Sequence, residues 1–207
     1  MKCDRMLLNY DKYQGFIFDM DGTLLDTMPV HLIAWENTAK KYDFPYSKDW
    51  IYSMGGMPSS KIISEINKCY QLNIPIQQAS QFKMRTFTDI SSNVERIEQV
   101  TDILEKYVGL KKIAVGTGSQ RISAERLLKL AGLYENIEVL VSANDVENHK
   151  PNPDTFVLAA AQLKLPPSQC LVFEDTQIGK QAAHAAKMDC VILEGKQLVF
   201  YPWNNKR

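Results

Sequence analysis

The sequence has no excess of charge and no long hydrophobic run. Its 207 residues carry 24 basic and 24 acidic side chains, so electrostatics do not favour nucleic acid or an anionic membrane as a partner. No apolar run approaches the length of a membrane span, and the first residues contain no stretch typical of a signal peptide. With 45% hydrophobic residues, the composition is that of a globular protein. We expect a monomer that binds neither nucleic acid nor membrane.

Cysteine is also scarce, and its spacing excludes a thiolate metal site. The four cysteines lack the paired spacing of zinc ligands: Cys3, Cys69, Cys170 and Cys190. Cys170 and Cys190 stand beside apolar runs, where a free thiol behaves as a small buried hydrophobe. We therefore expect free thiols and a cytoplasmic protein. The sequence contains no internal repeat and no low-complexity segment.

Five short apolar runs punctuate the chain, and helical patterns lie between most of them. The runs cover residues 16–18, 113–115, 139–141, 171–173 and 191–193. Short continuous apolar strands that alternate with helices are typical of a parallel sheet covered on both faces. The sequence thus predicts an α/β fold with a Rossmann-like parallel sheet. The aromatic end of the chain, LVFYPW, we expect to pack back on this core, with a partner-binding patch as the alternative.

The segment after the first run differs from the rest of the chain. Residues 29–92 contain no buried strand, but they show helical patterns over 30–42, 59–70 and 77–90. Helices inserted directly after the first strand are expected to cover the carboxyl edge of the sheet. We therefore predict a core formed by residues 1–28 and 93–207 and an inserted helical cap formed by residues 29–92.

Four acidic residues follow two of the predicted strands. Asp19 and Asp21 come directly after the first run, and Glu174 and Asp175 come after the run at 171–173. Ligands of open parallel sheets bind at the carboxyl ends of the strands, so these acids are expected to converge. Such a cluster suits Mg²⁺, which prefers carboxylate oxygens. In an extended D-x-D, one aspartate can be a nucleophile and the other a general acid and base.

A hydroxyl, a glycine turn and a lysine accompany these acids. Thr117 and Gly118 follow the run at 113–115, and their backbone N–H groups suit a phosphate. Lys150 stands in a proline-rich loop and supplies the positive charge that a transferring phosphoryl group requires. Together, the acids, the hydroxyl and the lysine predict phosphoryl transfer.

At these positions the chain resembles the haloacid dehalogenase-like superfamily. The resemblance rests on four motifs in order: Asp19-Met20-Asp21-Gly22-Thr23, Thr117, Lys150-Pro151 and Glu174-Asp175. The inserted helices resemble that family's C1 cap. The stretches DMDGTLLDT, AVGTGS, HKPNPDTF and VFEDTQIGKQAAHAAKMD are similar to the β-phosphoglucomutase-like branch, and most of all to its fructose-1-phosphatase type. Lys187 is a departure, because the branch usually has glycine there.

The resemblance implies a role for each matched acid. Asp19 is the nucleophile and a ligand of Mg²⁺. Asp21 is the general acid and base, and it binds the metal through its backbone carbonyl. Asp175, together with Glu174, completes the ligands of the ion.

The resemblance also implies which residues bind the substrate. Thr117, Gly118 and Lys150 hold the phosphoryl group, while His31 on the first cap helix orients the substrate. The implied activity is a Mg²⁺-dependent phosphatase that hydrolyses a small sugar phosphate of the fructose 1-phosphate kind through an aspartyl-phosphate.

Three alternatives stay open from the sequence: a β-phosphoglucomutase, a non-catalytic phosphometabolite-binding module and, more weakly, a dehalogenase. A mutase needs a second phosphate clamp, usually an arginine. The corresponding stretch, residues 55–63, offers only Lys61, although Lys83 and Arg85 follow later in the cap. The absence of an arginine from residues 55–63 favours the phosphatase over the mutase.

Overall fold

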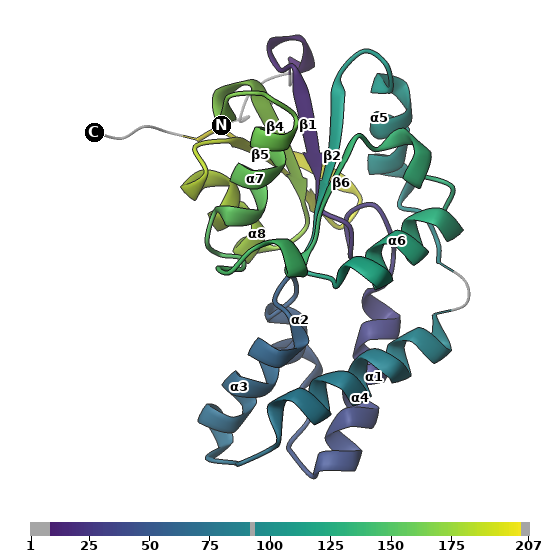
Figure 1. Ribbon diagram of the computed structural model, residues 1–207, viewed down its shortest axis with the longest axis vertical. Helices are drawn as coiled ribbons and strands as arrows, with labels where there is room; N and C mark the ends of the chain where they lie inside the picture. The colour runs from purple at the N-terminus through teal and green to yellow at the C-terminus, as the bar shows by residue number, and fades with distance from the viewer. Residues whose placement is uncertain (1–8, 92–93, 204–207) are drawn as a thin grey trace, which may run out of the picture.

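A six-stranded sheet forms the centre of the computed structural model, which describes residues 9–91 and 94–203 (Figure 1). The strand order is β3-β2-β1-β4-β5-β6. The strands are β1 (Gly15–Phe18), β2 (Lys112–Gly116), β3 (Val139–Val141), β4 (Cys170–Glu174), β5 (Asp189–Glu194) and β6 (Gln197–Tyr201). Strands β1 to β5 are parallel, and the predicted α/β fold is confirmed.

The first strand lies between β2 and β4, which explains its continuous apolar run. Phe18 is in register with Val115 on one side and with Phe173 on the other. Every residue of β1 is buried, as expected for a strand that has neighbours on both edges and helices on both faces. The residues that follow Phe18 therefore leave the sheet at its middle.

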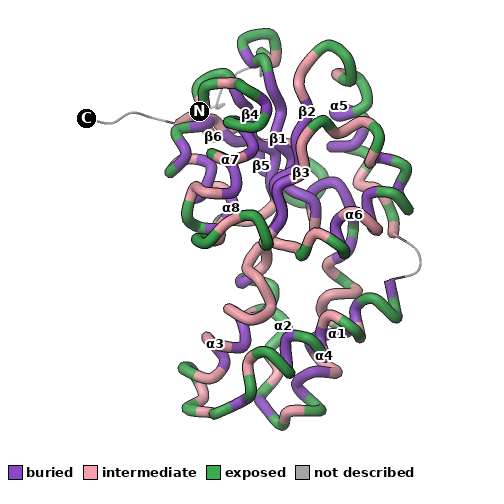
Figure 2. The backbone as a smooth tube through the Cα atoms, viewed as in Figure 1, coloured by how far each residue is buried: buried purple, intermediate pink, exposed green. Residues whose placement is uncertain are grey.

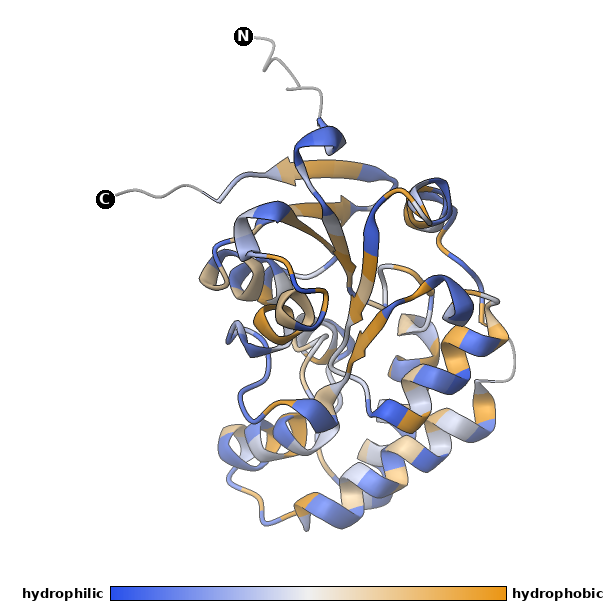
Figure 3. Ribbon diagram, turned by 45° about the horizontal axis from the view of Figure 1, so that its top comes forward, coloured by the Kyte–Doolittle hydropathy of each residue, from blue (hydrophilic) through white to orange (hydrophobic). Residues whose placement is uncertain are grey.

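Alternate side chains of β1 point into two separate hydrophobic clusters. Phe16 and Phe18 pack with α5 (Glu98–Tyr107) and α6 (Arg121–Leu130). Ile17 faces the other cluster, together with α7 (Asp154–Gln162) and α8 (Gln177–Ala185). The buried, hydrophobic strands thus run through the middle of a three-layer core (Figures 2 and 3). Cys170 and Cys190 are buried free thiols in it, as predicted.

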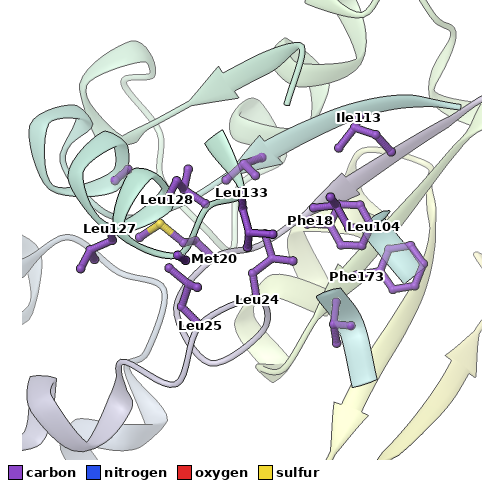
Figure 4. Close-up of a cluster of buried hydrophobic side chains, with 14 of the residues drawn as sticks. Phe18, Met20, Leu24, Leu25, Leu104, Ile113, Leu127, Leu128, Leu133 and Phe173 are labelled. Atoms are coloured by element: carbon purple, nitrogen blue, oxygen red, sulfur yellow. The ribbon is translucent and has the colours of Figure 1, made fainter. Parts of the chain in front are cut away.

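Apolar side chains anchor the loop that follows β1. Met20, Leu24 and Leu25 are fully buried in the cluster beneath α6 (Figure 4). The backbone N–H groups of Leu24 and Leu25 both donate to the carbonyl of Met20, which closes a tight turn. Because Met20 points into the core, the neighbouring Asp19 and Asp21 are left at the edge of the sheet.

Four helices extend from the carboxyl end of the sheet (Figure 1). They are α1 (Met28–Tyr42), α2 (Lys48–Ser53), α3 (Ser59–Tyr70) and α4 (Ile76–Ile90), and we call them the cap helices. Three of them match the predicted patterns, whereas α2 was missed. The domain boundaries at residues 28/29 and 92/93 stay a prediction.

The cap helices have a hydrophobic core of their own. Trp35, Ile63 and Ile66 are buried in it, together with Ala79 of α4.

Among residues 9–91 and 94–203, the structure contains no helix with the length and apolar character that crossing a membrane requires.

The aromatic end of the chain packs on the sheet, as predicted, but it does so as a strand. β6 pairs antiparallel with β5, placing Phe200 against the cluster of α5 and α6 and Tyr201 against the other cluster. The backbone N–H of Trp203 then donates to Asp189 Oδ1 at 2.7 Å. The end of the described chain is thereby fixed to the core.

Lys187 is strained in the turn after α8, where the related branch usually has glycine. Its φ is 62°, a left-handed conformation that a Cβ atom disfavours. We expect Lys187→Gly to raise the free energy of unfolding by about 1 kcal/mol, because glycine adopts this conformation without strain. Urea unfolding of Lys187→Gly and Lys187→Ala is the test. Equal stability of the two variants would show that the turn stores no strain.

Candidate active site

A lysine and two carboxylates meet in the buried centre of the carboxyl edge. Lys150 Nζ donates to Asp19 Oδ1 at 2.6 Å, to Glu174 Oε1 at 2.8 Å and to the carbonyl of Gly116 at 3.1 Å. Asp19, Lys150 and Glu174 are 3%, 1% and 1% exposed. Although burial alone would lower it, the neighbouring carboxylates raise the pKa of Lys150, so the ammonium form persists.

Asp175 joins these acids from the end of β4. Its Oδ1 accepts from Thr23 Oγ1 at 3.0 Å. Gly22 lies directly against it with φ +89°, and a Cβ atom there would come within 2.4 Å of Asp175 Oδ2. Glu174 Oε2 accepts from the backbone N–H of Asp175 and from both the N–H and the hydroxyl of Thr176. The D-x-D-G-T turn and the end of β4 thus fit each other closely.

The residues present fit a divalent cation. Asp19, Glu174 and Asp175, which we call the acid cluster, each offer a carboxylate oxygen, and these oxygens lie within 4.8 Å of one another. Burial, followed by the charge of Glu174, raises the pKa of Asp175 to about 7. Burial also raises the pKa of Asp19, against the effect of Lys150. A hard cation would relieve this repulsion and keep the oxygens ionised.

Asp21 has a different environment from Asp19. Its Oδ1 accepts from Thr27 Oγ1 at 2.6 Å, and its Oδ2 accepts from Ser119 Oγ at 2.6 Å. Thr117 Oγ1 lies 3.4 Å from the same Oδ2. Although burial acts in the opposite direction, His31 and the hydroxyls of Ser119 and Thr27 lower the pKa of Asp21. The two aspartates of the D-x-D therefore lie in different surroundings, which shift their pKa values in opposite directions.

A chain of contacts connects Asp21 to the cap. His31 Nε2 lies 3.3 Å from Asp21 Oδ1, and Lys83 Nζ lies 2.6 Å from His31 Nδ1. If Lys83 donates, the ring proton is assigned to Nε2 and faces Asp21. The ring of His31 stacks on Phe87 with centroids 4.0 Å apart. Burial and then the charge of Lys83 lower the pKa of His31.

The turn after β2 contacts the cap through two glycines. A Cβ atom on Gly118 would come within 2.2 Å of the carbonyl oxygen of Gly56, so the two backbones touch. The N–H of Ser119 donates to Thr117 Oγ1 at 3.0 Å, which shapes the turn. Helix α6 begins at Arg121, so residues 117–119 lie in the turn that precedes the helix.

A cavity of about 180 Å³ separates the cap helices from the core. Its core side includes Asp19, Asp21 and Gly118. Its cap side includes His31 and Lys83, whereas Lys61 and Arg85 are not among the residues that line it. Of the three cap cations considered as a second phosphate clamp, Lys83 is the one placed at the cavity.

The structure brings all eight predicted site residues to one edge of the sheet. Asp19, Lys150, Glu174 and Asp175 form one group, and Asp21 forms a second with Thr117 and His31. Gly118 lines the cavity beside both groups. Sequence reasoning missed Thr27 and Ser119 as partners of Asp21, and Lys83 as the partner of His31. Thr27 and Ser119 lie inside the motif stretches DMDGTLLDT and AVGTGS, which is the signal that pointed to them.

The sequence and the fold match known phosphate-handling proteins. The family model for haloacid dehalogenase-like hydrolases matches residues 16–193. Fructose-1-phosphate phosphatase YqaB of Escherichia coli is 37% identical over 182 residues, 88% of this chain and 97% of that protein. β-Phosphoglucomutase of Bacillus subtilis is 26% identical, covering 86% of this chain and 82% of that protein. A putative β-phosphoglucomutase structure from Bacteroides vulgatus is 26% identical, with a TM-score of 0.76 and coverage of 86% and 74%.

Replacement of Lys83 should change how stability depends on pH. Burial lowers the pKa of Lys83 to about 7, whereas an unfolded lysine titrates near about 10.4. Between these values the unfolded chain binds more protons, so the unfolding free energy of the wild type rises with pH. The rise is at most about 1.4 kcal/mol per pH unit. In Lys83→Met, the rise of the unfolding free energy with pH should be smaller than in the wild type.

Urea unfolding between pH 7 and pH 10 measures both slopes. Lys68→Met, which removes an exposed lysine of α3, is the matched control and should retain the wild-type slope. If Lys83→Met has the same slope as the wild type, the lowered pKa of Lys83 in the folded chain is contradicted.

Proposed function

Because this chain belongs to the haloacid dehalogenase-like hydrolase family, we propose that it is a Mg²⁺-dependent phosphatase of a small sugar phosphate resembling fructose 1-phosphate. The observation that carries the proposal is the pairing of Asp19 Oδ1 with Lys150 beside the acid cluster, at a cavity between the cap helices and the core. The similarity to a fructose-1-phosphate phosphatase over 88% of the chain supports the same substrate class.

In the first step, an oxygen of the Asp19 carboxylate attacks phosphorus. The bond from phosphorus to the sugar oxygen breaks, and the leaving oxygen takes up the proton of Asp21. Asp21 has to be protonated at this step, although its hydrogen bonds favour the ionised form, and it regains the proton in the second step. Lys150, the hydroxyl of Thr117 and the backbone N–H of Gly118 bind the phosphoryl oxygens. Mg²⁺ held by the acid cluster and by the backbone carbonyl of Asp21 would supply further positive charge there. The product is an aspartyl-phosphate and the free sugar.

In the second step, water attacks the phosphorus of the aspartyl-phosphate. Asp21 accepts a proton from this water, the bond to Asp19 breaks, and inorganic phosphate leaves. The hydroxyl donors around Asp21 favour its ionised form, which is the form that accepts a proton. His31, held by Lys83, orients the substrate from the cap side.

A mutase would transfer the phosphoryl group to a second sugar rather than to water. Its bisphosphate intermediate requires a cationic clamp at the end of the cavity remote from Asp19. Among the described residues, no arginine lines the cavity, which favours hydrolysis. Lys83 directs its ammonium to His31, the residue proposed to orient the substrate.

A substrate panel distinguishes the two reactions. Purified protein is given fructose 1-phosphate, or β-glucose 1-phosphate with a trace of glucose 1,6-bisphosphate, and both free phosphate and glucose 6-phosphate are followed. We expect phosphate release from fructose 1-phosphate to be the faster reaction. With EDTA in excess it should fall to below about 1%, and added Mg²⁺ should restore it.

Two outcomes would contradict the proposal. Formation of glucose 6-phosphate much faster than phosphate release would make the protein a mutase. Full hydrolysis in excess chelator, with metal verified absent, would refute the role given to the acid cluster.

A further inference from the structure

Ser80 carries a buried hydroxyl without a partner in the protein. It lies on α4, is 6% exposed and lines the cavity between the cap helices and the core. Across residues 9–91 and 94–203, the structure gives its side chain no hydrogen bond. A hydroxyl with little access to water gains a hydrogen bond when a ligand offers a matching group. At the wall of a ligand cavity, such a group indicates a partner on the ligand.

The other hydroxyls of α4 satisfy themselves within the helix. Thr86 Oγ1 donates to the carbonyl of Phe82 at 3.0 Å, and Thr88 Oγ1 donates to the carbonyl of Met84 at 2.9 Å. This bond to the preceding turn is open to any serine or threonine in a helix. Ser80 does not form it, so its hydroxyl remains available.

Ser123 provides the contrast that shows where the hydroxyl of Ser80 lies. On α6, the Ser123 Oγ atom is sealed from solvent and also lacks a hydrogen-bond partner. The Ser80 Oγ atom lacks a partner but is not sealed. Since Ser80 as a whole is buried and lines the cavity, the cavity is the space through which a ligand reaches this oxygen.

The side chains near Ser80 determine what its hydroxyl can bind. The cap wall of the cavity includes the apolar side chains of Trp35, Ile51 and Ile62. Lys83, one turn later on the same face of α4, has its ammonium directed to His31. An unpaired hydroxyl beside these apolar side chains discriminates between ligands, because a ligand without a matching group leaves it unsatisfied.

We propose that Ser80 determines substrate specificity by forming a hydrogen bond with a hydroxyl group in the carbohydrate part of the substrate. This inference rests on the proposed function, since it takes a sugar phosphate as the occupant of the cavity. The phosphoryl group is bound from the core by Lys150 and the turn at residues 117–119. Ser80, on a cap helix, therefore contacts the part of the substrate that carries no phosphate.

Steady-state kinetics of Ser80→Ala, which removes one oxygen atom, test this role. On the preferred sugar phosphate we expect kcat/KM to fall about 3- to 12-fold. On p-nitrophenyl phosphate, which has no sugar hydroxyl, kcat/KM should stay within about twofold of the wild type. Ser123→Ala removes an unpaired hydroxyl outside the cavity and should leave both values unchanged. Among monodeoxy analogues of the sugar phosphate, one should be hydrolysed equally by the wild type and Ser80→Ala.

Other results would overturn the proposal. Equal losses on both substrates would give Ser80 a structural role, and an unchanged kcat/KM on the sugar phosphate would remove it from the site. The wild-type rate on p-nitrophenyl phosphate reports separately on the proposed function. If the wild type hydrolyses neither compound, the proposed function fails, and the role of Ser80 fails with it.

Discussion

The interaction on which the site depends is the contact of one buried ammonium with two buried carboxylates. Lys150 binds Asp19 and Glu174 in a place with almost no access to water. Removal of the ammonium would leave these carboxylates buried without a positive partner, which is strongly destabilising. With Asp175 included, the ionised groups still leave two negative charges. The site thus has a deficit of positive charge, which a divalent cation would offset.

The fold explains how these charges come together. β1 and β4 are neighbours, so Asp19 and Glu174 leave adjacent parallel strands at the same edge. The buried Met20 and Leu24 fix the loop between the acids and the cap. The cap helices then close over the same edge through the contact of Gly56 with Gly118. A site that has to exclude bulk water is therefore formed between two separately packed hydrophobic cores.

The sequence was sufficient for the features that follow from local patterns. Apolar runs identified five strands, and the acids directly after two of them identified the edge that carries the site. The short helix α2 was missed, since its six residues are too few to show a helical period. β6 was expected only as a packed tail, because an antiparallel strand at the edge is half-buried and lacks a continuous buried run. Whether such a segment forms a helix or a strand depends more on the geometry of the folded chain than on its composition.

Contacts between residues that are far apart in the sequence could not be predicted from the sequence either. Ser119 is 98 residues from Asp21, and Lys83 is 52 residues from His31. Hydroxyls and lysines are common, and only the folded chain shows which of them face an acid. The roles proposed for Asp19, Asp21 and Lys150 rest on motifs, whereas the contacts that hold these residues in place are seen only in the folded chain.

The most direct measurement of the account is the identity of the residue that becomes phosphorylated. The protein is mixed with Mg²⁺ and fructose 1-phosphate, quenched in acid within milliseconds, digested and mapped by tandem mass spectrometry. The account predicts one acyl phosphate, on the carboxylate of Asp19, and its loss in Asp19→Asn. A phosphoryl group on Asp21, Ser119 or another residue, or turnover that proceeds in Asp19→Asn, would contradict it.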